Sequence, residues 1–150
     1  MTAALHLARP EDADRLDAIV AACHAEMGLT PDPEARRAAL APLLDGSPYG
    51  AAYLVGPTRA PVGFIIVTFS WSLAAGGLEG TVDQLYVRPP VRGRGIATEV
   101  LLTLPPALAE AGLCALHLRI SPDDDRVRRL CARSGFAGED GYVTMTRRLS

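Results

Sequence analysis

The sequence contains no lysine and no asparagine, so all 15 of its basic side chains are arginines. Without lysine it cannot form the GxxxxGK[ST] loop that cradles nucleotide phosphates in P-loop proteins. It also lacks an apolar run near the roughly 20 residues that a membrane span requires, and its first residues, MTAALHLARPED, do not join a basic region to an apolar one. We therefore expect a cytoplasmic protein without a membrane partner.

Cysteine is scarce and the charge is nearly balanced. Cys23, Cys114 and Cys131 are odd in number and too widely spaced for a CxxC motif, so we expect neither a disulfide nor a metal site. A formal net charge of -2 excludes a protein that grips nucleic acid through bulk positive charge. The 150 residues, 49% of them hydrophobic, fit one soluble domain over residues 1–150. Small molecules are the expected ligands.

The first half of the chain predicts a strand, two helices and a hairpin. A strand over residues 5–8 precedes a helix that opens at Pro10 and ends at Gly28. A second helix, capped by Asp32, starts at Pro33 and should bend at Pro42. Residues 51–55 and 62–73, rich in β-branched and aromatic side chains around a Gly/Pro turn, predict a β-hairpin.

The second half alternates strands and helices. TVDQLYV, residues 81–87, predicts a strand, and residues 96–104 predict a helix that should break at Pro105 and Pro106. Residues 114–121 predict a strand, the segment up to Gly135 a short helix, and YVTMTRRL, residues 142–149, a last strand. This order implies an α/β fold with helices on a mixed sheet.

The turn VRPPVRGRGIATEVLL, residues 87–102, predicts an anion-binding site. A turn between a strand and a helix start exposes unpaired backbone N–H groups, to which the helix dipole adds partial positive charge. Gly93 and Gly95 allow a close approach to the backbone, and Arg92 and Arg94 can supply charge. A tight turn with solvated arginines is the alternative interpretation.

Several segments together resemble the GNAT superfamily of N-acetyltransferases. RGRGIA, residues 92–97, resembles its R/Q-x-x-G-x-G/A acyl-CoA signature, and DQLYVRPPVRGRGIATEVLL its fourth strand and following helix. LHLRIS is similar to the fifth strand, and RRLCARSGF to the closing segment. The resemblance implies a GNAT fold, α/β, with a mixed, mostly antiparallel central sheet of six to seven strands flanked by about four helices.

That resemblance implies acetyl-CoA as co-substrate and direct transfer of its acetyl group to an amine, without a covalent enzyme intermediate. In the family a distortion splays the fourth strand from the fifth and opens a slot for the pantetheine arm. Asp124 falls where the family often has an asparagine that contacts the cofactor. The cofactor-binding residues implied here are Leu85, Tyr86, Val87, Arg92, Gly93, Arg94, Gly95, Ile96, Ala97 and Asp124.

The resemblance also implies catalytic positions. An alkyl ammonium with a pKa near 10.4 must lose a proton before it attacks, and Asp83 matches the strand acid that small-molecule members use for this task. The alternative is a strand acid paired with an arginine. Cys131 stands where the family has a tyrosine that protonates the CoA thiolate. Either Cys131 donates that proton, or it packs and water, Tyr86 or Tyr142 replaces it.

The acceptor pocket, by analogy with the family, lies between the two N-terminal helices and the end of the third strand. Gln84, where close relatives often carry a second acid, argues against a strongly cationic acceptor. We expect a primary amine of a small molecule or an amino-acid-like acceptor. A non-catalytic acyl-CoA-binding module, a protein N-acetyltransferase and a homodimer are the alternatives left open. Candidate lining residues are Glu26, Met27, Tyr49, Phe69 and Trp71, of which Met27 and Phe69 fit a core role equally well.

Overall fold

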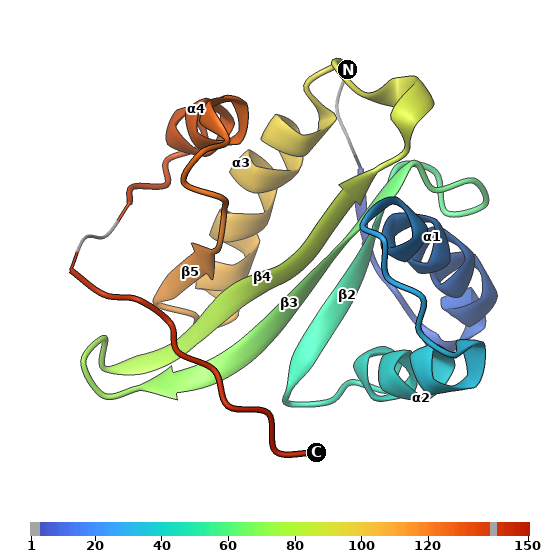
Figure 1. The fold of residues 1–150 in the computed structure, drawn as a ribbon, viewed down its shortest axis with the longest axis horizontal. Coiled ribbons are helices and arrows are strands. Elements are labelled where there is room, and N and C mark those ends of the chain that lie inside the picture. Colours follow the sequence, from blue (N-terminus) through green and yellow to red (C-terminus); the bar gives the residue numbers. More distant parts are fainter. Residues whose placement is uncertain (1–3, 139–140) are drawn as a thin grey trace.

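The computed structural model describes residues 4–138 and 141–150, which form one five-stranded mixed sheet with helices on both faces (Figure 1). The strands follow one another in sequence order, antiparallel from β1 to β4 and parallel between β4 and β5. They are β1 (Leu5–Leu7), β2 (Gly50–Val55), β3 (Gly63–Ser72), β4 (Gly77–Val87) and β5 (Ala115–Leu118). The helices are α1 (Ala13–Glu26), α2 (Pro33–Leu44), α3 (Ile96–Glu110) and α4 (Asp125–Arg133), with short 3-10 turns at Pro10–Asp12 and Pro89–Val91.

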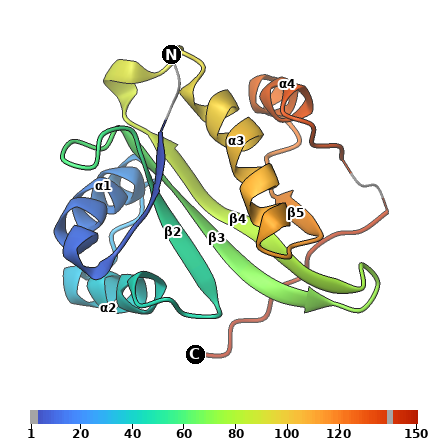
Figure 2. The ribbon, with the colours of Figure 1, turned by 180° about the vertical axis from the view of Figure 1, so that it is seen from behind.

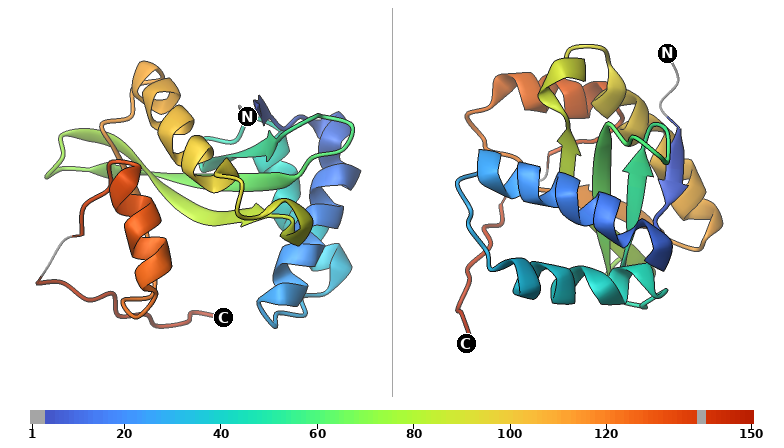
Figure 3. Two further views of the ribbon diagram at one scale, coloured as in Figure 1. Left: turned by 90° about the horizontal axis from the view of Figure 1, so that it is seen from above. Right: turned by 90° about the vertical axis from the view of Figure 1, so that its right-hand side faces the viewer.

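Two separate cores flank the sheet, because alternate side chains of its central strand point to opposite faces. Phe64 and Ile66 of β3 pack with α1 and α2, whereas Ile65 and Val67 pack with α3 and α4. Figures 2 and 3 show α3 on one face of the sheet and the α1–α2 pair on the other. The architecture is therefore the expected α/β sandwich of a mostly antiparallel sheet between helices. None of the helices in the described part of the chain has the length and apolarity that crossing a bilayer takes.

A buried ion pair joins the two helices of the first layer. Asp17 of α1 accepts from Arg36 Nε of α2 at 2.7 Å and from Arg36 Nη2 at 3.2 Å, and Arg37 Nε lies 3.4 Å from its second oxygen. The hydrogen bonds from Arg36 hold the pKa of Asp17 below its ordinary value, although burial opposes this effect. Asp17 is 6% exposed, so its loss would leave arginine charge without its partner.

We therefore expect Asp17→Asn to lower the melting temperature by several degrees at pH 7, because breaking one side of a buried pair is costly. A lowered folded-state pKa stabilises the native state above the unfolded value of about 3.9, and that contribution is lost as pH falls through the folded value. The difference between the two proteins should thus shrink below about pH 4. Thermal melts across pH check this. Asp14→Asn is the matched control. Asp14 is an exposed acid that pairs with Arg37 across the same two helices, so this variant should change the melting temperature little. A constant difference at every pH would contradict the assignment.

Helix α3 does not break at its prolines, contrary to the sequence prediction. It runs from Ile96 to Glu110 with Pro105 and Pro106 inside it. Each proline removes one backbone donor and crowds the preceding turn. The apolar face of the helix, with Leu101, Leu104 and Leu108 buried, supplies the packing that keeps the helix continuous.

The predicted last strand is also absent from the described residues. Residues 142–149 form neither helix nor strand there, and the side chains of Tyr142, Val143, Met145 and Leu149 are almost fully exposed. The sheet has five strands, one fewer than the lower number expected.

Strand β4 carries an extra residue and leaves the fifth strand halfway along its length. Against β3, Val82 pairs with Val67 and Gln84 pairs with Ile66, so Asp83 forms a β-bulge. Against β5, pairing covers only Glu79 to Val82. From Asp83 to Val87 one edge of β4 therefore lacks a strand partner among the described residues, and Figure 1 shows the two strands diverging there.

Candidate functional site

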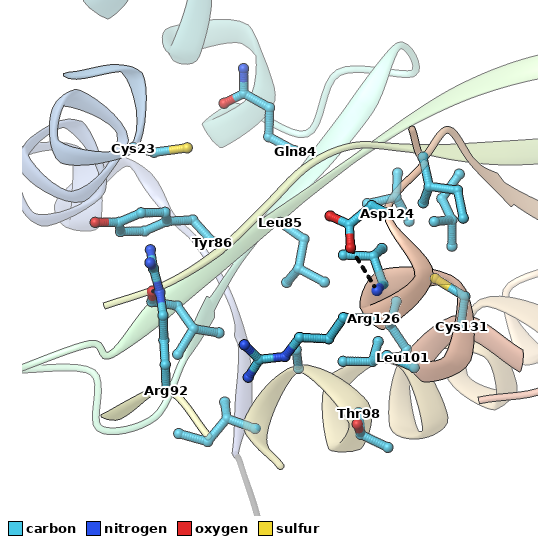
Figure 4. Close-up of a pocket in the computed structure, with 18 of the residues that line it drawn as sticks. Cys23, Gln84, Leu85, Tyr86, Arg92, Thr98, Leu101, Asp124, Arg126 and Cys131 are labelled. Carbon is cyan, nitrogen blue, oxygen red and sulfur yellow. Dashed lines mark hydrogen bonds between the residues drawn. The ribbon is translucent and has the colours of Figure 1, made fainter. Parts of the chain in front are cut away.

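A cleft of about 870 Å³ occupies the opening between β4 and β5. Strand β4, the start of α3, helix α4 and the end of α1 surround it (Figure 4). Its size is in the range of small-molecule and cofactor sites. The cleft brings together most of the site residues predicted from the sequence: Glu26, Met27, Asp83, Leu85, Tyr86, Val87, Arg92, Gly93, Gly95, Ile96, Ala97, Asp124 and Cys131.

The glycine turn supplies open backbone donors at one end of the cleft. Gly93 and Gly95 have φ of +80° and +77°, a left-handed conformation that favours glycine. A Cβ on Gly95 would have nothing within 4 Å, so the space beside its backbone is open. Among the described residues, no backbone acceptor is bonded to the N–H groups from Gly93 to Thr98. The turn and the first turn of α3 can therefore receive an anion.

Arg92 is held by protein groups. Its Nη1 and Nη2 donate to the two carboxylate oxygens of Glu26 at 2.7 Å each, and its Nε donates to the Val87 carbonyl at 2.8 Å. The guanidinium also lies 5.3 Å from the centroid of the Tyr86 ring. Arg92 holds the pKa of Glu26 below its ordinary value, while burial and the nearby Glu26 raise the pKa of Tyr86. Arg92 thus connects the end of α1 to the glycine turn.

The bulge places Asp83 at the cleft with an exposed side chain. No hydrogen bond or ion pair to this carboxylate occurs within residues 4–138 and 141–150, so it is open to a ligand. The next residue, Gln84, has its Oε1 3.1 Å from His24 Nε2 of α1. Because an amide oxygen only accepts, Nε2 is the donor in this contact. The histidine Nδ1 is buried and has no partner among the described residues.

The opposite wall comes from α4. Asp124 lines the cleft and caps this helix, with its Oδ1 accepting from the Val127 N–H at 3.1 Å. Cys131 is 5% exposed, and burial raises the pKa of its thiol. The sulfur therefore stays protonated near neutral pH, which suits both packing and proton donation.

Four predicted site residues lie elsewhere. Arg94 does not line the cleft, although its turn does. Phe69 packs in the core beneath α3, Trp71 is 70% exposed on the same strand, and Tyr49 is exposed at the start of β2. Phe69 and Trp71 follow Val67 at two-residue spacing, which directs them to the α3 face rather than toward α1 and α2.

The cleft also holds residues that sequence reasoning missed, namely Cys23, Thr98, Leu101, Arg119, Arg126 and Arg133. Arg126, Leu130 and Arg133 recur at spacings of four and three, so they share one face of α4. This helical spacing is the feature of the sequence that could have indicated a cleft-facing side of α4. No cluster of His, Cys, Asp and Glu suited to a metal ion occurs in the described part of the chain.

Comparison with known proteins gives one family and many similar folds. The family model described as the acetyltransferase (GNAT) family matches residues 13–136. Integron cassette protein HFX_CASS3, from the mobile metagenome of Cole Harbour Salt Marsh, is 27% identical, with a TM-score of 0.84 over 97% of this chain and 90% of its own. No curated protein matches the chain.

Two further solved structures share the fold at low identity. A predicted acetyltransferase with acetyl-CoA from Clostridium acetobutylicum has a TM-score of 0.76 at 18% identity, over 97% of this chain and 96% of its own. An aminoglycoside acetyltransferase from an uncultured soil metagenomic sample, in complex with sisomicin, has a TM-score of 0.79 at 13% identity, over 99% and 97%.

Proposed function

Since this chain belongs to the GNAT family of acetyltransferases and is an acetyl-CoA-dependent acyltransferase, we propose that it acetylates the primary amine of a small or amino-acid-like molecule. The observation that carries the proposal is the separation of β4 from β5 at the Asp83 bulge, in the same cleft that the glycine turn lines. This opening joins an unpaired strand edge, an anion-binding turn and a free carboxylate in one cleft.

The residues of the cleft fit acetyl-CoA. The N–H groups from Gly93 to Thr98 would hold its diphosphate, in space that a Cβ on Gly95 would fill. The unpaired edge of β4 from Asp83 to Val87 offers backbone donors and acceptors to the two amides of the pantetheine arm. When bound, acetyl-CoA supplies the thioester carbonyl that an amine attacks.

Asp83 would prepare the acceptor. Its carboxylate has no partner among the described residues, so it can hold an ammonium group and pass the proton to water. An alkyl ammonium has a pKa near 10.4, so a carboxylate is too weak a base to deprotonate it directly and completely, and water takes part. The protonated thiol of Cys131 is one donor available to the departing thiolate, and water is the other.

A small acceptor is favoured by the immediate surroundings of Asp83. Gln84 is neutral and held by His24, and Glu26 is neutralised by Arg92. Among the acids of the described residues that line the cleft, Asp83 is therefore the one without a protein partner, which matches one ammonium group rather than a row of them. The aminoglycoside acetyltransferase with the same fold, in complex with sisomicin, shows that this fold accommodates a small-molecule acceptor.

The proposal is tested by giving the pure protein acetyl-CoA and a panel of amines, amino acids and short peptides. We expect CoA release with one class of small primary amine, and a product heavier by one acetyl group. Activity with peptides alone would replace the proposal with protein N-acetylation. Silence over the whole panel, in protein shown to bind acetyl-CoA, would favour an acyl-CoA-binding module instead.

A further inference from the structure

Arg126 is a cationic side chain in the cleft with no protein partner. It is the second residue of α4 and lines the cleft, and Figure 4 shows its guanidinium extending away from α4 into the space between β4 and α3. The structure gives it no hydrogen bond or ion pair with any residue in 4–138 or 141–150. Its neighbour Arg128 instead donates to the Pro122 carbonyl at 3.2 Å.

The arginines of the glycine turn leave little positive charge free for an anionic ligand. The fork of Arg92 is occupied by Glu26, and Arg94 does not face the cleft. Asp124 adds a negative charge to the opposite wall. The arginines within the turn therefore contribute little free positive charge, so within the turn itself only backbone N–H groups would face a diphosphate that carries about two negative charges.

The geometry points to Arg126 as a binding residue for the diphosphate of acetyl-CoA, closing on it from the side opposite the glycine turn. This inference rests on the proposed function, since it needs acetyl-CoA in this cleft. A guanidinium offers two parallel donors to phosphate oxygens, which is the geometry that suits a fork without a carboxylate partner. Arg126 would thus supply the positive charge that Arg92 cannot offer, because Glu26 neutralises Arg92.

The test is the affinity of the full chain for CoA and for 3′-dephospho-CoA, measured by calorimetry. We expect Arg126→Gln to weaken both by at least about tenfold, because one charge-assisted contact is lost in each case. Arg126→Lys should recover part of the loss, since it keeps the charge without the fork. The affinity of Arg126→Gln should also depend less on salt.

Arg128→Gln is the matched control, two residues further along the same helix and outside the cleft. It should bind both ligands like the wild type, and thermal melts establish that each variant is folded. A loss confined to CoA would assign Arg126 to the 3′-phosphate and overturn the inference, as would equal affinities for the two glutamine variants. If the wild type itself binds no CoA, the proposed function fails rather than this assignment.

Discussion

Gly95→Val should weaken acetyl-CoA binding at least about 100-fold, because two effects combine at the glycine turn. Gly95 has φ of +77°, a conformation in which a β-branched residue is an outlier. The valine side chain would also enter the open space beside the N–H groups from Gly93 to Thr98. Displacing the ligand from two or more of these donors costs about 1.5–3 kcal/mol for each charged contact. Calorimetry with acetyl-CoA measures the loss.

Gly112→Val separates strain from ligand contact. Gly112 lies just after the other end of α3, with φ of +99° and nothing within 4 Å of an added Cβ. The Gly112→Val variant should lose about as much stability as Gly95→Val, since both glycines have a left-handed backbone conformation. It should keep its affinity for acetyl-CoA. Equal affinities of the two valine variants would remove the glycine turn from the binding site.

Asp83→Asn should lower kcat/KM for amine acetylation by about 100-fold or more, the range expected when an acid–base group is lost. The amide keeps the size of the side chain but can neither hold an ammonium as a charge partner nor receive its proton. Affinity for acetyl-CoA should be nearly unchanged, because the backbone of β4 is untouched. Steady-state kinetics with the acceptor found in the panel, together with binding measurements, check both expectations.

Glu79→Gln is the control for Asp83→Asn. It changes an acid on the same strand that lies outside the cleft, where it bonds to His117 Nε2 at 2.9 Å. Its turnover should stay close to that of the wild type. If Asp83→Asn also turns over normally, Asp83 has no part in the mechanism and another group handles the proton.

The parts of the fold that local chemistry decides could be predicted from the sequence. Asp32 caps α2, its Oδ2 accepting from the Ala35 N–H at 3.1 Å, and Gly28, at φ of +76°, follows the end of α1. Capping and left-handed glycine act over a few residues, so the sequence pattern contains them. The glycine turn was predictable for the same reason.

Tertiary context decided the parts that could not be predicted. Pro105 remains inside α3 because burial of the helix outweighs the lost hydrogen bond, which a local rule does not weigh. Arg92 meets Glu26 across 66 residues of sequence, so its occupied fork could not be foreseen. Packing likewise decides which face of β3 the helices α1 and α2 cover. Phe69 lies on the opposite face and packs against the core of α3 and α4.

The spacing of apolar residues in the sequence is consistent with the bulge. In TVDQLYV the residues directed to the α3 core are Val82, Leu85 and Val87, at spacings of three and then two. A regular strand keeps a spacing of two throughout, so the interval of three marks one inserted residue. The resemblance to the family implied a distortion that splays this strand from the fifth, and the structure has a bulge at Asp83.

The inserted residue separates the chemistry of this protein from its folding. The strand pairs with β3 on both sides of Asp83, with the register shifted by one residue across it, so all the remaining residues from Gly77 to Val87 have a paired position. Asp83 alone opposes no residue of β3 and packs in neither core. A substitution there leaves the packing of both layers as it was. The reacting end of the cleft can therefore be redesigned, for a different amine or a different proton acceptor, while the sheet that supports it is left unchanged.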